Sequence, residues 1–538
     1  MSKLFDRAAN ISTSLKVLGG SGIIRPYGPR TLAGLGKTVL RWGTGPAGGF
    51  MTLAVRHPDR VGLIDELGEL TFGEMHGRSN ALARGLAGLG VKEGDSVAVM
   101  CRNHRGFVDA SIAVAKLGAD ILYLNTAFAG PQLVDVIARE KPAVIVHDEE
   151  FSQLLADADV AQRVIGWSDG ADHGGVETLE GLISAHDQSD VTPPTRHARI
   201  VILTSGTTGT PKGAPRKEAG IPAAVSLLSR MPLEFGWRTH IAAPLFHTWG
   251  FAHFALSMLL GSTVVLRRRF DPEDVLRVVE ENQCESLVVI PVMLQRILSL
   301  DDSVLSGYSM PSLKVVASSG SALPGELALN WMDRFGDNLY NIYGSTEVAW
   351  ATIATPEDLR AAPSSAGKPP HNTIVRIFDD ADQEVPTGGT GRIFVGNSLL
   401  FEGYTGGGSK SMIDGLMSSG DVGRFDADGR LYVEGRDDEM IVSGGENVFP
   451  KEIEDCLVGH PAVVEAAAIG IDDPEFGARL RAFVSVCAEV TEDELKEHVK
   501  ANLARFKVPK QIVVIPELPR NATGKILKRE LAAWDEPA

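Results

Sequence analysis

Residues 204–213 read TSGTTGTPKG and directly follow Ile200–Leu203, a short apolar run typical of a strand. The ten residues combine several hydroxyl side chains with three glycines and one lysine, Lys212. Glycines let backbone N–H groups approach a polyphosphate, hydroxyls donate to its oxygens, and the lysine neutralises charge. The stretch therefore predicts a phosphate-binding loop after a strand, although a flexible polar surface loop has the same composition.

The residue order separates this loop from the common P-loop motif, which ends in Gly-Lys followed by Ser or Thr. Here the lysine is followed by the last glycine instead. Gly36-Lys37-Thr38 has the ending of that motif, but Thr31 stands where the motif requires its first glycine. We therefore interpret residues 36–38 as structural.

Strand-like and helical patterns alternate along the rest of the chain, which predicts an α/β body with a parallel sheet covered by helices. The alternation is clearest at Val97–Met100 (strand), Gly106–Leu117 (helix), Ile121–Leu124 (strand), Pro131–Arg139 (helix) and Ala143–His147 (strand). Similar strand patterns occur at Ile200–Leu203, Ser286–Ile290, Leu313–Ala317 and Ile374–Phe378. Residues 176–198 are polar and read as a surface connection.

After about residue 436 the pattern changes to that of a small α+β domain. Pro450 occupies a first helical turn, and Thr491 with Glu494 forms a capping-box signature. The expected elements are a helix over Glu452–Val458, strands at Val463–Ile469 and Arg481–Val486, a helix from Thr491 to about Leu503, and a strand at Gln511–Ile515. The predicted division is an N-terminal extension (1–50), a large domain (51–436) and a small mobile C-terminal domain (437–538).

Composition limits the classes of function. A chain of 538 residues is too long for one ordinary core, and 44% hydrophobic with 22% charged residues is a globular balance. The net charge of −17 argues against nucleic acid as a partner. The cysteines lie far apart, which predicts neither a disulfide framework nor a zinc site and fits a reducing cytoplasm; they are Cys101, Cys284, Cys456 and Cys487.

Residues 1–50 differ from the rest of the chain because they carry seven basic side chains and one acid, Asp6. The segment is therefore +6, which leaves −23 for the remainder. No secretory signal and no apolar window of spanning length is present. We expect the segment either to lie on an acidic membrane surface, at the inner face of the membrane, or to pack on its own acidic body or in an oligomer.

The Thr204–Gly213 loop resembles the phosphate loop of the adenylate-forming superfamily, which comprises acyl-CoA synthetases, peptide-synthetase adenylation domains and luciferases. Further motifs similar to those of the family follow in its order, so that the resemblance runs from about residue 50 to the C-terminus. They are PLFHTW (244–249), SGSALP (319–324), YGSTE (343–347), the stretch 419–454 and PRNATGKILKREL (519–531). The resemblance implies a large α/β AMP-binding domain joined by a hinge to a small C-terminal domain, and an ATP-dependent acyl-CoA ligase that acts through an acyl-AMP.

The resemblance also implies roles for individual residues. Tyr343 would lie against adenine, Thr346 would contact the α-phosphate, Glu347 would help to hold Mg²⁺, and Asp421 would accept from the ribose hydroxyls. The full ATP- and AMP-binding set comprises Thr204, Ser205, Gly206, Thr207, Thr208, Gly209, Lys212, Gly320, Ser321, Ala322, Asn341, Tyr343, Gly344, Thr346, Asp421 and Arg436.

Catalysis and the second half-reaction are assigned in the same way. Lys525 would stabilise charge at the α-phosphate during adenylation, and His247 would border the carboxylate. Asp438 aligns with the family's hinge. Gly444, Gly445 and Glu446 resemble the residues at the coenzyme A tunnel, and His247, Trp249, Phe251 and Ser318–Ser321, with Gly344, would line the acyl pocket.

The sequence leaves alternatives open for the acid substrate, the acyl acceptor and the activity itself. Small residues at 318–321 and Gly344 favour a medium- or long-chain fatty acid, but aryl and other acids remain. A carrier protein is the alternative acyl acceptor to coenzyme A, although the compact stretch from Asp421 to Gly444 favours coenzyme A. A nucleotide-binding regulator without catalysis is opposed by the presence of Lys212, Glu347, Asp421 and Lys525. In addition, Ala214–Lys217 replaces the aromatic or histidine-bearing segment that often follows the family's loop.

Overall fold

The structure is a computed structural model of the chain. It describes residues 2–43, 45–128, 130–170, 173–204, 212–213, 220–345, 347–401, 403, 409–437, 441–443, 446–473, 477–503, 507–521 and 524–534. Two compact units make up the chain. Unit 1 comprises Met1–Val289, Arg296–Ala317 and Ser398–Ser409, and unit 2 comprises Ile290–Gln295, Ser318–Asn397 and Lys410–Ala538. The predicted division into residues 1–50, 51–436 and 437–538 is a different partition and stays a prediction.

In unit 1, the predicted phosphate loop connects the last two strands of a seven-stranded sheet. In spatial order its strands are β7 (Glu177–Thr178), β6 (Gln162–Trp167), β5 (Val144–Asp148), β3 (Ser96–Met100), β4 (Asp120–Tyr123), β8 (Ile200–Thr204) and β9 (Lys212–Gly213). All neighbouring pairs are parallel except β8 and β9. Helices α5 (Arg105–Lys116) and α6 (Gly130–Glu140) make the crossovers that parallel pairing requires, as predicted. The 3₁₀ turn η1 (Glu149–Phe151) follows β5.

A second sheet of unit 1 has the strand order β13 (Val315–Ser318), β12 (Ser286–Val289), β10 (Arg238–Ile241), β11 (Thr263–Val265), β1 (Val61–Asp65) and β2 (Gly68–Thr71), with β13 ending at the unit boundary. The pairs that β10 makes with β11 and β12 are parallel, whereas β1 and β2 form an antiparallel hairpin. In sequence, the helices of unit 1 that lie between or next to these strands are α4 (Phe72–Gly88), α8 (Ile221–Leu228), α9 (Thr248–Leu259), α10 (Pro272–Glu281) and α12 (Asp302–Leu305). Helix α11 (Pro291–Leu298) crosses the boundary between the two units.

The basic N-terminal segment forms helices, and they continue through Gly34, Gly36, Gly48 and Gly49. The helices are α1 (Ser2–Gly20), α2 (Pro29–Trp42) and α3 (Pro46–Arg56). Helix α3 is well buried through Phe50, Met51 and Leu53, and α2 packs on it. Among the described residues, no helix is long and apolar enough to cross a membrane.

Two expectations about unit 1 and unit 2 were wrong. Part of the polar stretch 176–198 forms β7 and helix α7 (Leu179–Ala185), because Leu182 and Ile183 give it an apolar face that is buried. Strand β16 (Ile374–Phe378) does not continue a parallel sheet. It pairs in antiparallel fashion with β17 (Gly391–Gly396), in a sheet of its own within unit 2.

That antiparallel sheet of unit 2 has the order β16, β17, β19 (Leu416–Phe425) and β18 (Met412–Ile413), with β20 (Leu431–Arg436) paired to β19. Unit 2 also holds the antiparallel pair β14 (Leu339–Tyr343) and β15 (Thr352–Ala354). Helices α13 (Gly325–Phe335) and α14 (Pro356–Ala361) flank that pair in sequence. Because β19 lies between β17 and β20, its side chains are fixed from both edges.

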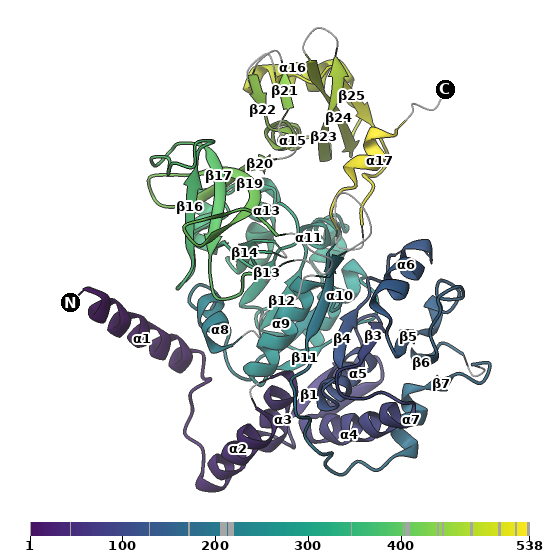
Figure 1. The fold of residues 1–538 in the computed structure, drawn as a ribbon. Helices are drawn as coiled ribbons and strands as arrows, with labels where there is room; N and C mark the ends of the chain where they lie inside the picture. The colour runs from purple at the N-terminus through teal and green to yellow at the C-terminus, as the bar shows by residue number, and fades with distance from the viewer. Residues whose placement is uncertain are drawn as a thin grey trace. The chain divides into compact units, whose positions relative to one another are not determined.

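The C-terminal part of unit 2 is an α+β fold, as predicted. Its strands run in the order β22 (Glu446–Val448), β21 (Ile441–Ser443), β24 (Gly477–Val486) and β23 (Val463–Asp473), with β25 (Gln511–Val514) parallel to β24. Helices α15 (Pro450–Val458) and α16 (Glu492–Asn502) cover a core that includes Ile453 and Leu495, and α17 (Lys528–Ala532) follows (Figure 1). The Thr491–Glu494 capping box is confirmed. Strands β23 and β24 are longer than their patterns predicted.

Candidate active site

Among the buried polar atoms of unit 2 that lack a protein partner in the described part of the chain, two belong to residues of the predicted site. They are Ser318 Oγ at the end of β13 and Asn341 Oδ1 on β14. The Ser318 side chain is completely buried and Asn341 is 8% exposed. An unpaired buried hydroxyl or amide costs free energy unless a ligand or water satisfies it. Both residues belong to the predicted nucleotide and acyl sites, so the structure leaves hydrogen-bonding capacity where the sequence predicts a ligand.

Next to Asn341 in unit 2, a tyrosine, an aspartate and an arginine converge from three strands. The Tyr343 hydroxyl on β14 donates to Asp421 Oδ2 on β19 at 2.5 Å. Arg436 on β20 is the direct cross-strand partner of Asp421, and its Nη1 donates to Oδ1 at 3.3 Å. Each carboxylate oxygen of Asp421 can accept more than one hydrogen bond, so capacity remains for further donors such as ribose hydroxyls.

Burial sets the ionisation of this cluster. It raises the pKa of the Asp421 carboxyl above its ordinary value, while the hydrogen bond from Tyr343 and the charge of Arg436 lower that pKa in part. Burial, with the negative charge of Asp421, raises the pKa of Tyr343 well above its usual value. The tyrosine therefore stays a neutral donor, and Arg436 is the cation that favours an ionised Asp421.

The turn after β14 orients the carboxylate predicted to hold magnesium. Ser345 Oγ donates to Glu347 Oε2 at 2.8 Å and accepts from the backbone N–H of Glu347 at 3.2 Å. Gly344 has no room for a side chain, because an added Cβ would lie 2.1 Å from the carbonyl oxygen of Ala349. Gly320, in the other predicted loop, has φ +97°, a conformation that favours glycine. Ser321 next to it is half-buried and Ala322 is exposed.

Lys410 lies near this cluster, and it was not among the site residues predicted from the sequence. A Cβ added to Gly420 would lie 3.1 Å from Arg436 Nη1 and 3.2 Å from Lys410 Nζ. The two cationic groups therefore flank the backbone next to Asp421. Lys410 had no recognisable signal, since it follows a glycine-rich stretch and belongs to none of the quoted motifs.

Lys525 lies in a tight turn of unit 2 and its side chain is exposed. Its backbone N–H donates to Asn521 Oδ1 at 2.9 Å, and its carbonyl accepts from the Asn521 N–H at 2.9 Å. Arg520 anchors the same turn, because it donates to the Gly524 carbonyl and pairs with Glu465 on β23 at 2.6 Å. The predicted catalytic lysine thus projects from a turn that is attached to the C-terminal sheet.

Other predicted residues belong to unit 1. The backbones of Thr204 and Lys212 pair across β8 and β9, so the predicted phosphate loop connects two hydrogen-bonded strand ends. His247 precedes α9, and burial lowers its pKa to about 4, which keeps the imidazole neutral at pH 7. Trp249 Nε1 donates to the Val289 carbonyl at 2.8 Å.

Trp249 and Phe251 take part in an aromatic group around α9. The Trp249 ring meets His253 edge-on at 4.2 Å, and Phe251 lies 5.2 Å from Tyr123, centroid to centroid. Burial lowers the pKa of the His253 imidazole to about 4, and a backbone hydrogen bond with Trp249 raises that pKa in part. This cluster joins the two predicted acyl-pocket aromatics to residues that the sequence did not single out.

Several predicted site residues lie outside the described part of the chain. They are Ser205, Gly206, Thr207, Thr208, Gly209, Thr346, Asp438, Gly444 and Gly445. Only the backbone is described for Thr204, Lys212 and Glu446. Their roles remain predictions.

A group of potential metal ligands in unit 1, Cys101, His104 and Asp148, was not expected from the cysteine spacing. All three are fully buried. His104 Nδ1 accepts from the Gly106 N–H at 3.0 Å, so its Nε2–H donates to Asp148 Oδ1 at 2.8 Å. Burial also raises the pKa of the Cys101 thiol well above its usual range. These residues form a hydrogen-bonded network, and we assign no metal to it.

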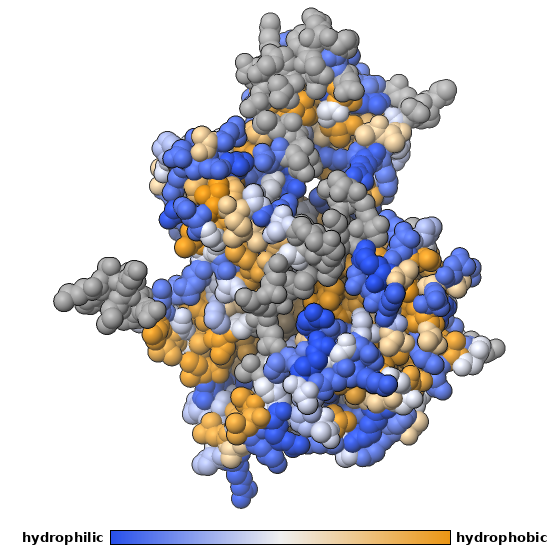
Figure 2. All heavy atoms as spheres, viewed as in Figure 1, coloured by the Kyte–Doolittle hydropathy of each residue, from blue (hydrophilic) through white to orange (hydrophobic). Residues whose placement is uncertain are grey.

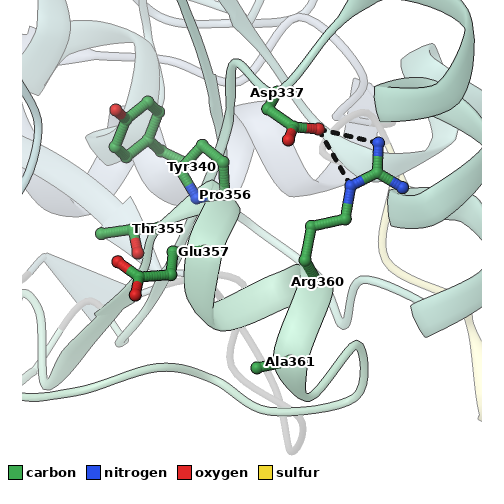
Figure 3. A pocket seen from close by; sticks show the side chains of 7 residues that line it. All are labelled: Asp337, Tyr340, Thr355, Pro356, Glu357, Arg360 and Ala361. Atoms are coloured by element: carbon green, nitrogen blue, oxygen red, sulfur yellow. Dashed lines mark hydrogen bonds and ion pairs between the residues drawn. The ribbon is translucent and has the colours of Figure 1, made fainter.

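A surface pocket of about 780 Å³ in unit 2 contains none of the predicted site residues. Figure 3 shows its lining, in which Arg360 pairs with Asp337 at 2.7 Å. The lining residues are Asp337, Tyr340, Thr355, Pro356, Glu357, Arg360 and Ala361. Tyr340 is near the start of β14, whereas the Tyr343 cluster is at the end of that strand.

Comparisons with known proteins agree with the motif order. A family model described as AMP-binding enzyme matches residues 50–405, and one described as AMP-binding enzyme C-terminal domain matches residues 452–525. Feruloyl-CoA synthase from Amycolatopsis sp is 33% identical over 86% of this chain and 93% of the relative. Indoleacetate–CoA ligase from Aromatoleum aromaticum is 30% identical over 89% of this chain and 94% of the relative.

Among solved structures, o-succinylbenzoate CoA synthetase from Bacillus subtilis, in complex with its acyl-adenylate intermediate, superposes with a TM-score of 0.78. The two chains are 28% identical, and the match covers 90% of this chain and 97% of the other.

Proposed function

The chain belongs to the AMP-binding enzyme family, the acyl-CoA synthetase type of the adenylate-forming superfamily, and from this premise we propose that it joins an aromatic carboxylic acid to coenzyme A. The enzyme class is that of an AMP-forming acid–CoA ligase. The expected fold, a large α/β part with a small C-terminal domain, is confirmed. The aromatic substrate and the individual residue roles are what we propose here.

The observation that carries the proposal is the polar cluster of unit 2. Asp421 and Arg436 are fixed against each other across two strands, and Tyr343 holds the same carboxylate. Ser318 and Asn341 add buried polar atoms without close protein partners in the described part of unit 2. A nucleoside monophosphate supplies two things that this set can accommodate: hydroxyl donors for Asp421, and a base with edge donors and acceptors for the buried polar atoms.

The chemistry requires activation because a carboxylate has no good leaving group. In the first step, the acid's carboxylate oxygen attacks the α-phosphorus of ATP and the bond to pyrophosphate breaks, which gives an acyl-AMP. Lys525 would stabilise the negative charge that develops on the α-phosphate oxygens. Lys212 and the loop that precedes it would neutralise the phosphates.

Magnesium fits the residues present. Glu347 supplies a carboxylate held in place by Ser345, and hard cations prefer carboxylate and phosphate oxygens. Glu347 would hold Mg²⁺, which supplies neutralisation of the phosphate charge. Positioning and charge stabilisation then account for most of the rate that such phosphoryl chemistry needs.

In the second step, the thiol sulfur of coenzyme A attacks the acyl carbon and AMP leaves, which forms the thioester. We propose that rotation at Asp438 removes Lys525 and brings Gly444, Gly445 and Glu446 to the thiol, so that one site serves both steps. Coenzyme A is the acceptor named for the three relatives described above.

The aromatic substrate is supported by two observations. Ferulate, indoleacetate and o-succinylbenzoate, the acids named for the three relatives, all carry an aromatic ring. In addition, Trp249 and Phe251, predicted to line the acyl pocket, belong to the aromatic group of α9. Aromatic side chains bind a flat ring by stacked or edge-on contacts. The relatives give no support to the fatty acid that the small residues at 318–321 suggested.

The experiment that tests this proposal is a panel of carboxylic acids with ATP, Mg²⁺ and coenzyme A, in which pyrophosphate and thioester are both measured. The panel compares hydroxycinnamic, benzoic and arylacetic acids with medium- and long-chain fatty acids. We expect the highest kcat/KM with an aromatic acid. A preference for fatty acids would overturn the aromatic assignment, and pyrophosphate release without thioester would favour a carrier protein as acceptor.

A further inference from the structure

The most unusual surface of unit 1 is the outward face of α2. Six of the eleven large hydrophobic side chains that are exposed among the described residues lie between residues 11 and 40. Three of them are on α2: Leu40 is 88% exposed, Leu32 54% and Val39 43%. Figure 2 shows hydrophobic colouring over the surface where α2 lies. Exposed leucines at this density need a physical reason.

The helical spacing of α2 separates three faces. Thr38 and Trp42, four residues apart, are buried against the rest of unit 1. Leu32 and Val39, seven residues apart, lie on one exposed stripe. Leu40 is the next residue, about 100° further round the helix, and it widens the exposed apolar face. Between them stand Ala33 and Gly36, which are exposed and small. The exposed face is therefore apolar across a wide arc of the helix.

A cationic stripe borders this apolar face. Arg30, Lys37 and Arg41 follow spacings of seven and four residues, which place them on one side of α2, and all three are exposed. None of them pairs with a carboxylate of the described chain. A helix with a buried attachment side, an apolar face and a basic flank matches the arrangement of a helix that lies in the plane of a lipid surface.

We propose that α2 attaches unit 1 to the surface of an anionic phospholipid bilayer, with Leu32, Val39 and Leu40 among the acyl chains and the cationic stripe at the headgroups. The inference goes beyond the proposed function, since it concerns where the enzyme acts and not its chemistry. Exposed Ile11 and Leu15, four residues apart on α1, add an apolar stripe close in sequence.

Charge favours this occupant over the two others that could cover the face. A second copy whose α2 packs antiparallel on this face would set its own cationic stripe beside this one, which costs free energy. The body of the same chain has a charge of −23 over residues 51–538 and could attract the cationic stripe. However, α2 packs on that body through its buried side, and its apolar face stays exposed. An anionic bilayer satisfies both the charge and the apolar face.

The test is co-sedimentation of the full-length protein with vesicles of phosphatidylcholine alone or mixed with phosphatidylglycerol, at low and high salt. We expect binding to the mixed vesicles only, weakened by salt. The triple variant Arg30→Glu/Lys37→Glu/Arg41→Glu should lower the apparent affinity by roughly a hundredfold, since each basic residue near anionic lipid contributes roughly fivefold. Leu32→Ser/Leu40→Ser should also lower it by roughly a hundredfold.

Matched controls change equivalent residues elsewhere. Leu67→Ser removes an apolar side chain that is 58% exposed in the turn between β1 and β2, and Lys92→Glu/Lys141→Glu/Lys500→Glu makes the same change in net charge at other exposed positions. Both should bind vesicles as the unchanged protein does. Pyrophosphate release and melting temperature, measured for all four variants, show that each still folds.

Three results would overturn the proposal. The first is the same vesicle binding by the α2 variants and the controls, and the second is no binding by the unchanged protein at low salt. The third is an oligomer that dissociates in the Leu32→Ser/Leu40→Ser variant, because a second copy would then occupy the face.

Discussion

Tyr343 and Asp421 are 78 positions apart in the sequence, and yet the tyrosine hydroxyl donates to the carboxylate at 2.5 Å. The contact joins the end of β14 to the middle of β19, two strands of different sheets within unit 2. The residue proposed to lie against adenine is therefore fixed to the residue proposed to accept from ribose. Base and sugar would meet a preformed pair, which lowers the entropy lost on binding.

The Asp421–Arg436 pair gives a pH prediction. Arg436 lowers the pKa of Asp421, which burial raises. In Arg436→Gln that pKa rises further, so ionised Asp421 is lost at a higher pH, and the acidic limb of kcat/KM for ATP should move to higher pH. The value at neutral pH should also fall by about tenfold or more. Asp421→Asn is the control, since it removes the titrating group; an unmoved limb in Arg436→Gln would exclude Asp421 as its origin.

Lys525→Ala should lower adenylate formation by about a hundred- to a thousandfold, because we propose that the ammonium stabilises charge in that step alone. Pyrophosphate exchange with the acid and ATP measures this step. Thioester formation from pre-made acyl-AMP should persist. Lys500→Ala, at an exposed lysine of the same C-terminal fold, serves as the control. An equal loss of both half-reactions would contradict the assignment of Lys525 to the first one.

Asp438→Pro should show the opposite pattern. Proline fixes φ, so the backbone change proposed between the half-reactions is blocked and acyl-AMP should accumulate without thioester. Rapid-quench measurement of acyl-AMP and thioester separates the steps. Asp438→Ala removes the same side chain but keeps the backbone rotation, and it should make thioester. Failure of both variants in the second step would assign the effect to the carboxylate instead of the hinge.

Gly344→Ala should damage the turn that carries Glu347. The new methyl would meet the Ala349 carbonyl and the Trp350 Cα, at 2.1 and 2.7 Å, and neither backbone atom can move without shifting the turn. We expect a stability loss of about 1–3 kcal/mol together with weaker pyrophosphate release. Gly88→Ala, where nothing lies within 4 Å, is the matched control and should leave melting temperature and activity unchanged. Full activity of Gly344→Ala would show that the turn tolerates displacement.

A buried lysine in unit 1 predicts a pH-dependent stability. Lys116 Nζ contacts Ser79 Oγ and Asn80 Oδ1 at 2.7 Å and His76 Nδ1 at 2.9 Å. Burial lowers its pKa to about 7, whereas the unfolded chain keeps a value of about 10.5. Between these values the unfolded chain binds more protons at this site, so stability rises with pH.

Lys116→Met should remove that contribution. The free energy of unfolding is measured in urea at about pH 7.5 and about pH 9. Its increase with pH should be smaller in Lys116→Met than in the unchanged protein, by up to about 1.4 kcal/mol per pH unit. Lys92→Met removes an exposed lysine and should keep the original slope. An identical slope in Lys116→Met would mean that this lysine stays protonated in the fold.

The regular elements of the body were predictable because their signals are local. The buried strands β3, β4 and β5 are continuous apolar runs, and the capping box of α16 lies within four residues. Pairing partners were not predictable in the same way. Ile374–Phe378 has the apolar pattern of a parallel strand, but its partner β17 decides its direction.

The candidate site depended even more on long-range geometry. No spacing rule brings Tyr343 to Asp421, and only the resemblance to a family placed both at one nucleotide. The unpaired oxygens of Ser318 and Asn341 and the approach of Lys410 to Gly420 exist only in three dimensions. In contrast, α7 could have been found, since Leu179, Leu182 and Ile183 have helical spacing within a polar stretch.

The turn that carries Lys525 is held by a residue remote from the chemistry. Arg520 and Glu465 are both largely buried, and their ion pair attaches the turn to β23. Among naturally occurring sequence variants, a change at Glu465 would therefore resemble the loss of Lys525, although Glu465 belongs to none of the predicted site motifs. During evolutionary drift the two positions would have to change together, which makes Glu465 and Arg520 a covarying pair to look for in diverged copies of this gene.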